Sequence, residues 1–335
     1  MLTAVEIITG TVLVVLVLVD ALVTTLSVST GAGPLTRRVT GALWRAVLWR
    51  HPRGREGTPL RFSGVLMLTV TASTWVLLLW AGWSLLFLGS GAVVNSTTGR
   101  AAGMLDTVYF AGFSTATLGV GDYTANQPGW RLLAAVAGFT GFLLITLAVT
   151  YLLSVVQAVV AARALAVHVF ALGAHPQEVV ARGWSGGRFS SAFTQHLVNL
   201  SSEVAQVAEQ HLAYPVLHYC HTGRAGAAAS LAVATLDEAA LILSAAVAAD
   251  ARPDDSTVAP VREAVSGYAR TVAATSALVP TPDAPPAPAL TALAEAGVPL
   301  TDGGTFERAV RAQGDRRAGL RRVVENSGWT WPQTG

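Results

Sequence analysis

Three long apolar stretches constrain the fold of this chain more strongly than any other feature of its sequence. They run roughly from Leu2 to Val28, from Val65 to Leu88 and from Leu132 to Val160. A membrane-spanning helix needs about 20 consecutive apolar residues, and each stretch is long enough. Charged residues make up only 13% of the chain, against about 25% in ordinary soluble domains. The sequence therefore predicts an all-α membrane protein with three spanning helices in contact with lipid.

Arginine residues predict the orientation of these spans. Residues 31–62 carry a single acid, Glu56, against seven arginines: Arg37, Arg38, Arg45, Arg50, Arg53, Arg55 and Arg61. Short cytoplasmic loops are enriched in basic residues, so this loop is expected in the cytoplasm. The N-terminus and the segment between the second and third spans then lie outside the cell. Everything after residue 160 lies in the cytoplasm, as in a multi-pass plasma-membrane protein.

The basic loop also contains a helical pattern. From Leu35 to Arg50, apolar residues and arginines recur at helical spacing. This pattern is typical of an amphipathic helix on the inner leaflet, and an irregular basic loop is the alternative. All 22 basic residues are Arg and the net charge is only +2. We read this as a general preference for Arg over Lys, so we expect no nucleic-acid partner.

The segment between the second and third spans contains the most informative motif. Residues 106–123 read DTVYFAGFSTATLGVGDY, which is too short and too polar for another full span. Its apolar first half predicts a re-entrant half-helix, and its second half predicts an extended strand that contains glycine. Non-helical backbone at membrane depth is tolerated only inside protein or along a water-filled cavity. The order span, half-helix, strand and span therefore predicts a pore.

The sequence Thr117-Leu-Gly-Val-Gly-Asp122 resembles the T-V-G-Y-G-D selectivity filter of the potassium-channel family. The resemblance to these pore-loop cation channels, bacterial members included, covers roughly residues 62–157. It implies that main-chain carbonyls and the Thr117 hydroxyl replace the water shell of K+. Glycine permits backbone angles that other residues resist. The expected ion site consists of Thr117, Leu118, Gly119, Val120 and Gly121, and a Gly-rich external turn is the alternative.

The resemblance also implies an assembly and a support for the filter. The chain has one filter motif, and a potassium-channel pore needs four, so a homotetramer is expected. Val120 stands where the family often has an aromatic residue, so the filter lacks that support, although selectivity for K+ is still expected. Asp122 is expected to bond to an aromatic residue of the pore helix. Tyr109 is the candidate, because its hydroxyl can donate one hydrogen bond.

The third span contains two glycines, Gly138 and Gly141. The resemblance implies a gating hinge here, because Gly141 lies where the family often places it. Ile145, Val149 and Leu153 would then line the cavity and the inner gate, where an apolar ring can close a pore by dewetting. Close packing of helices is the alternative, since small residues are common in membrane helices.

Two acids lie in the first span. Glu6 is expected at the outer interface, whereas Asp20 lies deep in the apolar stretch. An ionisable residue inside a membrane segment is a functional or paired residue by default. We expect structural pairing with hydroxyls such as that of Thr24 or with a neighbouring span, and a role in gating is the alternative.

The chain after residue 160 is expected to form helices at 190–213, 227–249, 258–277, 289–296 and 305–325, with the inner helix continuing to about Leu172. Strands alternating with helices and a Gly-x-Gly-x-x-Gly turn are both missing from this sequence, so no nucleotide-binding domain is predicted. The predicted organisation is an N-terminal span (1–30), a basic segment (31–62), a pore module (63–160), a connector (161–187), a helical domain (188–277) and a Pro-rich linker with terminal helices (278–335). Within the pore module we expect a span at 65–88, a pore helix and filter at 104–123 and an inner helix at 131–160.

Five side chains of the cytoplasmic part are close in sequence: His196, His211, His218, Cys220 and His221. A metal site or a proton sensor is conceivable, but the spacing fits no standard ligand pattern, and ordinary packing is the simpler interpretation. A single cysteine excludes an intrachain disulfide. We expect no enzyme activity, no cofactor and no metal other than permeant K+.

The sequence therefore predicts a tetrameric K+-selective channel. An unidentified signal, such as a ligand bound to the cytoplasmic helices, would gate it. Two alternatives remain: a nonselective monovalent cation channel, and a nonconducting membrane receptor or scaffold that uses the pore fold.

Overall fold

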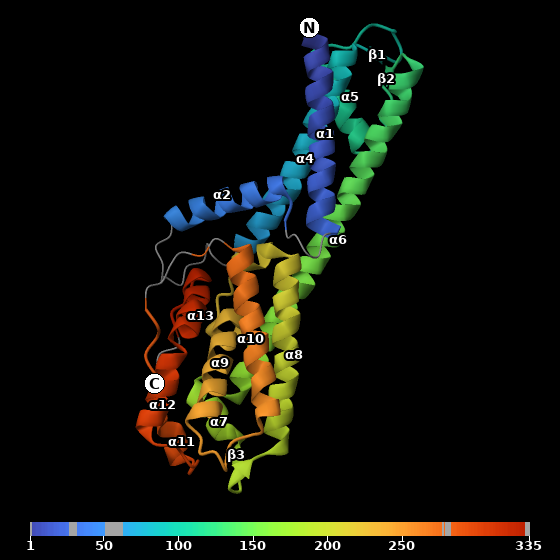
Figure 1. Ribbon diagram of the computed structural model, residues 1–335. Helices are drawn as coiled ribbons and strands as arrows, with labels where there is room; N and C mark the ends of the chain where they lie inside the picture. The colour runs from blue at the N-terminus through green and yellow to red at the C-terminus, as the bar shows by residue number, and fades with distance from the viewer. Residues whose placement is uncertain (1, 27–31, 51–62, 277, 279–282, 332–335) are drawn as a thin grey trace. The chain divides into compact units, whose positions relative to one another are not determined.

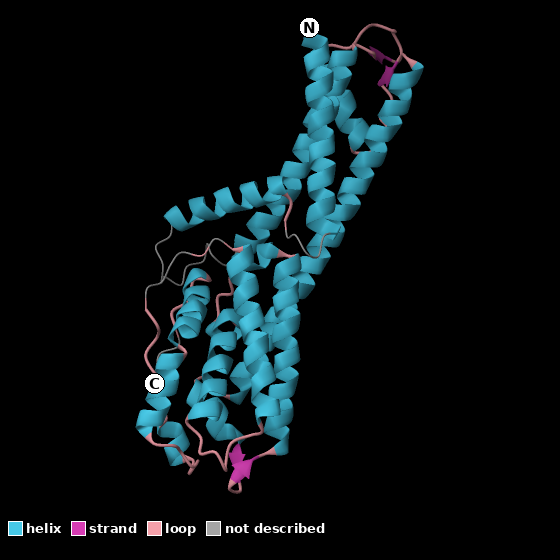
Figure 2. Cartoon of the chain, in the orientation of Figure 1, coloured by secondary structure: helices cyan, strands magenta, loops and turns pink. Residues whose placement is uncertain are grey.

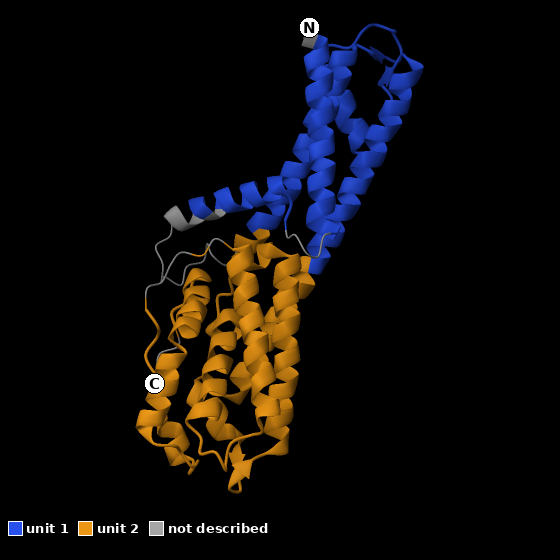
Figure 3. Ribbon diagram, viewed as in Figure 1, with its two compact units in different colours: residues 1–46, 66–154 blue, residues 47–65, 155–335 orange. Residues whose placement is uncertain are grey.

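The computed structural model describes most of the chain and divides it into two compact units, which Figure 3 colours separately. Unit 1 comprises residues 1–46 and 66–154, and unit 2 comprises residues 47–65 and 155–335. The described residues are 2–26, 32–50, 63–276, 278 and 283–331. Arg53, Arg55, Glu56 and Arg61 of the basic loop lie outside them.

Unit 1 is built from long helices and one short pair of strands (Figures 1 and 2). It contains all or most of α1 (Leu2–Leu26), α2 (Pro34–Arg50), α4 (Ser63–Ser90), β1 (Val93–Asn95), α5 (Met104–Thr115), β2 (Tyr123–Ala125) and α6 (Pro128–Leu172), the last of which continues into unit 2. Within the described residues, α1, α4 and α6 are long and apolar enough to cross a membrane. The three predicted spans are therefore confirmed, and so is a helix over the basic segment from residue 34 to residue 50.

Buried side chains from α1, α4, α5 and α6 form one core in unit 1. Val17, Trp75, Phe110 and Leu144 come from these four helices in that order. The rings of Phe87 and Phe110 meet edge-on with their centroids 4.9 Å apart, a geometry that aromatic pairs prefer. The short helix α5 is therefore held by packing against the longer helices.

The carboxylate of Asp20 joins α1 to the start of α2. Its side chain is fully buried, and its Oδ1 accepts a hydrogen bond from the Leu35 N–H at 2.7 Å. Its Oδ2 accepts bonds from the Thr36 hydroxyl at 2.6 Å and from the Trp75 indole at 2.9 Å. The first N–H groups of a helix lack helical partners, and negative charge is favourable there.

The structure thus confirms the structural pairing predicted for Asp20, both with a hydroxyl, that of Thr36, and with the neighbouring span α4 through Trp75. Only the named candidate, Thr24, is not a partner. Thr24 does not bond to Asp20; its hydroxyl accepts a hydrogen bond from the Gly33 N–H at 2.9 Å. Gly33 itself leaves room for the carboxylate, since a Cβ there would overlap Asp20 Oδ1. The sequence did not single out Leu35, Thr36 or Trp75, because these partners lie 15 to 55 positions from Asp20.

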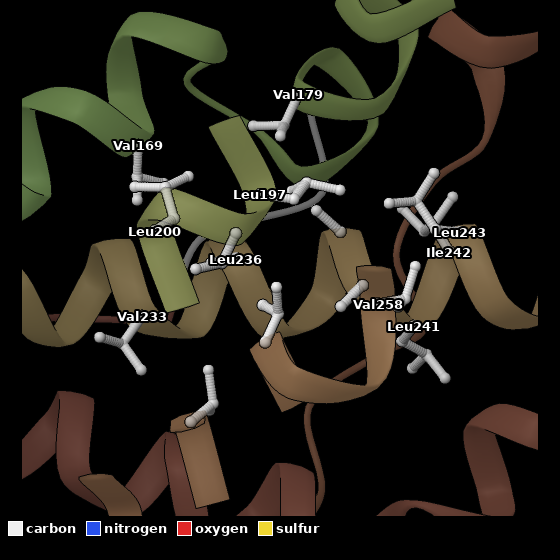
Figure 4. Close-up of a cluster of buried hydrophobic side chains, with 14 of the residues drawn as sticks. Val169, Val179, Leu197, Leu200, Val233, Leu236, Leu241, Ile242, Leu243 and Val258 are labelled. Carbon is white, nitrogen blue, oxygen red and sulfur yellow. The ribbon is translucent and has the colours of Figure 1, made fainter. Parts of the chain in front are cut away.

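Unit 2 is a helical module around one central helix. Its elements are α7 (Pro176–Gly183), β3 (Trp184–Ser185), β4 (Arg188–Phe189), α8 (Ser191–Ala213), η1 (Pro215–Tyr219), η2 (Ala225–Ala227), α9 (Ala229–Ala245), α10 (Asp255–Thr275), α11 (Thr291–Glu295), α12 (Gly303–Ala312) and α13 (Gly314–Asn326). Every residue of α9 from Ser230 to Leu243 is buried, as expected for a mostly apolar helix at the centre of a module. Figure 4 shows Val233, Leu236 and Ile242 of α9 within the core.

The inner helix enters this module without a break. Helix α6 continues to Leu172, as its sequence pattern predicted. Leu165, Ala166 and Val169 near its end are fully buried in the core of unit 2, beside Val179 of α7 and Leu197 of α8. The last turns of α6 are therefore an integral part of unit 2.

The break predicted around Gly183 to Gly187 is more ordered than expected. Helix α7 precedes it, and β3 and β4 pair antiparallel across it. Gly186 and Gly187 form the connection with φ values of +61° and +80°, the signs that a tight two-residue hairpin turn requires. The expected single helix over 305–325 is also wrong, because Gln313 separates α12 from α13.

Two adjacent ion pairs fasten α13 to α9. Arg317 is 1% exposed and bonds to both carboxylate oxygens of Glu238, at 2.7 and 2.8 Å. Arg316 pairs with Asp237 at 2.6 Å. Burial raises the pKa of Glu238, and the hydrogen bonds and charge of Arg317 oppose that rise. Buried charges are tolerated only when they are paired in this way.

Arg317 also contacts the Pro-rich stretch, which the sequence predicted to be a linker. Arg317 also donates to the carbonyls of Pro285 and Pro286 at 2.8 and 2.6 Å. The described part of this stretch therefore lies against α13, and it is not a free linker there. Residues 280–282 lie outside the described part of the chain.

The histidines near residue 211 occupy different environments. Burial lowers the pKa of His211 to about 3 and that of His218 to about 4, so both are neutral at physiological pH and neither supports proton sensing there. His221 stacks on Trp329, with ring centroids 5.2 Å apart, and His196 is exposed. Burial raises the pKa of Cys220 to about 11. Among the described residues, no group of three or more His, Cys, Asp or Glu side chains could hold a metal ion.

The Asp20 network predicts a large loss of stability on substitution. Asp20→Ala leaves the Leu35 and Trp75 donors buried without an acceptor, and each such donor costs about 1–3 kcal/mol. We expect a clear fall in the thermal unfolding midpoint in detergent. Glu6→Ala, at the partly exposed start of the same helix, serves as the control and is expected to change the midpoint little. Equal midpoints for the two variants would show that the buried carboxylate does not stabilise the protein.

Candidate ion-conducting site

The predicted half-helix is helix α5, which starts and ends with defined contacts. The Gly103 N–H donates to the Asp106 carboxylate at 3.1 Å near the first turn, where an acid is favourable. Phe110, Ala111 and Phe113 are buried in the core of unit 1. The helix is therefore fixed by its apolar face, and its C-terminal end at Thr115 leads directly into the predicted filter.

The residues after α5 form an irregular extended segment. Gly119 and Gly121 have φ values of +60° and +87°, in the region that a Cβ disfavours. Thr117 has a φ of +56°, an outlier for a β-branched residue and thus a strained position. The Leu118 N–H donates to the Phe113 carbonyl at 2.9 Å. This bond holds the strained start of the segment against the end of α5.

A second contact holds the outer end of the same segment. The Asp122 carbonyl accepts hydrogen bonds from the N–H and the hydroxyl of Ser96, at 2.9 and 3.0 Å. Directly beyond it, Tyr123 of β2 pairs with Asn95 of β1 in an antiparallel register. Sequence reasoning missed this support, because strands of three residues carry no detectable periodicity.

The aromatic brace expected for Asp122 is not formed within one chain. The Tyr109 ring meets the Tyr123 ring at 6.3 Å and the Phe113 ring at 5.2 Å. Among the described residues, no hydrogen bond joins the Tyr109 hydroxyl to Asp122. Tyr109 therefore packs against two aromatic rings beside the predicted filter.

The predicted filter residues lie together on the surface of the single chain. Residues 116–122 are all exposed, and the Leu118 side chain is 71% exposed. Ile145, Val149 and Leu153 of α6 are also exposed, each about half or more, and their spacing of four residues puts them along one face of the helix. An apolar surface of this extent on a membrane helix has room to contact lipid or further copies of the chain.

Two of the glycines of α6, Gly138 and Gly141, have a packing role. A Cβ on Gly141 would overlap the Thr115 carbonyl oxygen, and one on Gly138 would lie 3.2 Å from the Ser114 carbonyl oxygen. The end of α5 therefore rests directly on the backbone of α6. Close packing is thus the role that the structure supports for these residues, and α6 is a continuous helix through both. The hinge role of Gly141 stays a prediction.

Comparison with known proteins assigns the chain to a class. Residues 64–158 match a family described as "Ion channel", and these residues contain α4, α5, the filter segment and most of α6. Residues 64–158 therefore form an ion-channel module of the pore-loop class, which points to a channel and not to an enzyme.

A relative matches almost the whole chain. The chain is 33% identical over 327 residues to the uncharacterized membrane protein YdjJ of Bacillus subtilis (strain 168), with 97% of this chain and 95% of the relative covered. The chain belongs to the same family as YdjJ, and the similarity extends over unit 2 and the first apolar helix as well as residues 64–158. No solved structure matches the chain.

The contact at Gly141 predicts a specific defect. In Gly141→Ala the new methyl group overlaps the Thr115 carbonyl, so α5 must shift, and overpacking of this kind costs about 1–3 kcal/mol. We expect lower thermal stability and loss of ion flux in proteoliposomes. Gly129→Ala is the matched control, because a Cβ at Gly129 of the same helix meets no atom within 4 Å. Normal flux through Gly141→Ala would show that α5 does not need this close contact.

Proposed function

We propose that the protein is a homotetrameric K+-selective channel of the plasma membrane, with residues 117–121 of each subunit as its filter. The observation that carries the proposal is the geometry of the segment after α5. Gly119 and Gly121 adopt positive φ angles in an exposed strand whose two ends are fastened to α5 and to Ser96. A strand held in this way can present successive carbonyl oxygens to an ion.

The chemistry of conduction follows from four such strands around one axis. Carbonyl oxygens from each ring of residues replace the water shell of K+, and neighbouring sites exchange ions by mutual repulsion. The C-terminal end of α5 carries partial negative charge and lies against the middle of α6 at Gly141. In the assembly this end favours a cation below the filter.

The homotetramer is proposed because each chain has one filter segment and a potassium-channel pore is lined by four. Closed rotational symmetry is the simplest assembly of identical subunits. In such an assembly the exposed filter segment would line the central pathway. The exposed faces of Ile145, Val149 and Leu153 would line it too or would be covered by neighbouring subunits. A hydrated pathway below the filter could be closed by the apolar ring of these side chains.

For gating, we propose that the signal reaches the pore through α6. This helix runs from the pore module into the core of unit 2. A cytoplasmic ligand that binds two arrangements of unit 2 with different affinity would shift the equilibrium between the open and the closed pore. The size of the shift is that difference in binding free energy. The identity of this ligand, and the hinge at Gly141, stay predictions.

One recording separates the proposed function from its alternatives. With K+ on one side of a reconstituted bilayer and Na+ on the other, we expect a current that reverses near the K+ equilibrium potential. Reversal near zero would favour a nonselective monovalent cation channel, for which the absence of an aromatic residue at Val120 is the supporting feature. Absence of current from correctly assembled protein would favour a receptor or scaffold.

The matched variant in this recording is Gly121→Ala. A Cβ at φ +87° is strained, so the carbonyl ring should lose its geometry and conduction should be abolished while the oligomer stays intact. Gly129→Ala should conduct normally. K+ currents of ordinary size from Gly121→Ala would contradict the filter assignment.

The proposed orientation places the filter exit and the N-terminus outside the cell and α2 inside. In a Cys220→Ser background, Thr97→Cys and Ala4→Cys should react with an impermeant thiol reagent added to intact cells, because both positions are exposed. Arg38→Cys on α2, which is also exposed, should react only after the membrane is opened. External labelling of Arg38→Cys would reverse the orientation.

A further inference from the structure

An apolar cavity of about 380 Å³ lies within unit 1, beside the filter segment. Helix α4 contributes Val76 and Trp80 to its wall, and α6 contributes Gly141 and Ile145. The C-terminal half of α5 and Leu118 of the filter complete it. The Trp80 indole is fixed in this wall, because its N–H donates to the Val108 carbonyl at 2.9 Å.

The size and lining of the cavity indicate the chemistry of its occupant. An apolar cavity of about 150 Å³ is already large enough to bind benzene and stays free of water. The cavity beside Leu118 can therefore accept an aromatic ring with room to spare. An unfilled space of this size would deprive its lining of dispersion contacts, so an apolar group is expected to fill it in the assembled channel.

Symmetry narrows the choice of occupant. This step rests on the proposed function, in which identical subunits surround an axis perpendicular to the membrane. Rotation about such an axis leaves depth in the membrane unchanged, so the group that a neighbouring subunit presents to the cavity lies at the depth of the cavity itself. Because α6 lines the proposed pathway, we take the α6 helix of the neighbour as the one that faces the cavity. The cavity reaches α6 between Gly141 and Ile145. The occupant must therefore come from about that level.

Within this stretch of α6, the exposed side chains are those of Phe142 and Ile145. Ile145 lines the cavity itself, whereas Phe142 does not and is 62% exposed. Gly141 points toward the end of its own α5, and successive residues of a helix are about 100° apart. Phe142 is thus directed about 100° away from the face of α6 that contacts its own pore helix.

We propose that Phe142 of one subunit inserts into the cavity beside the filter of the next subunit. The contact is heterologous, since the aromatic ring and its cavity are different surfaces of the same chain, and such a contact closes into a ring when the rotation allows. The ring of the neighbouring Phe142 then packs against Leu118, whose own carbonyl is assigned to the ion pathway. Phe142 is in this way a positioning residue for the filter of its neighbour.

The inference gives the filter an aromatic support from another subunit. Val120 stands where an aromatic residue would brace the strand from within its own chain. The neighbouring Phe142 would press on the same strand two residues earlier, at Leu118, which is 71% exposed in the single chain. A lipid chain in the cavity would supply the same apolar volume but no fixed position, and it is the competing outcome of the test.

The test is a disulfide between two chains. In a Cys220→Ser background, one tagged chain carries Val76→Cys in the cavity wall and a differently tagged chain carries Phe142→Cys. After co-expression and mild oxidation of the membranes, we expect a covalent dimer that contains both tags. Val156→Cys replaces Phe142→Cys in the control, because it is exposed on the same helix but lies about 21 Å further along it.

The outcomes separate the inference from the proposed function. A tetrameric mass without the Val76–Phe142 disulfide would overturn the inference and leave the channel assignment intact, with lipid as the occupant of the cavity. Disulfides between chains that carry only Phe142→Cys would place this residue at the central axis and would also overturn the inference. A monomeric mass for the native protein would refute the homotetramer itself.

A second measurement tests the positioning role without cysteines. Phe142→Ala should lower the temperature at which the oligomer dissociates and should reduce the preference for K+ over Na+, whereas Phe142→Leu should restore much of both. Phe139→Ala, another exposed phenylalanine of α6 one turn earlier, is the control and should leave the ion preference unchanged. Equal ion preference in Phe142→Ala and the native protein would show that Phe142 does not position the filter.

Discussion

The contact between the C-terminal end of α5 and the backbone of α6 fixes the geometry of the pore module. A Cβ at Gly141 would overlap the Thr115 carbonyl, so the two backbones touch with no side chain between them. This contact determines the depth of the half-helix and, through the Leu118 N–H bond to Phe113, the place where the filter segment begins. The strained φ of Thr117 is tolerated because the segment is held on both sides of it.

The other end of the filter segment depends on a different element. Ser96, just after β1, holds the Asp122 carbonyl with two hydrogen bonds, and the pairing of β1 with β2 keeps Ser96 in place. Short paired strands satisfy backbone groups that would otherwise face the pore entrance unpaired. The loop before α5 is therefore a structural support of the segment that we propose as the filter.

Outside the pore, buried acids organise both units in the same physical way. Asp20 collects N–H and O–H donors at the start of α2, and Glu238 receives the guanidinium of Arg317 inside unit 2. In each case a buried carboxylate is stabilised by several directed donors, so removing the donors or the acid is expected to be costly. These acids specify which helix packs where, a choice that apolar packing alone leaves loosely determined.

The amino-acid sequence was sufficient to predict the three long apolar helices, the half-helix and most of the helices after residue 160. These features depend on local apolar periodicity and on a short motif with its flanking context, and both can be recognised along the chain. The family match over residues 64–158 agrees with that interpretation. Other features became visible only in the folded chain: the partners of Asp20, the packing role of Gly138 and Gly141, the support of Asp122 by Ser96 and the pairing of Arg317 with Glu238. Each of these joins residues distant in sequence, the last pair by 79 positions. A single sequence carries no signal for such pairs, because a hydrogen bond or a close backbone contact depends on where the chain returns in space.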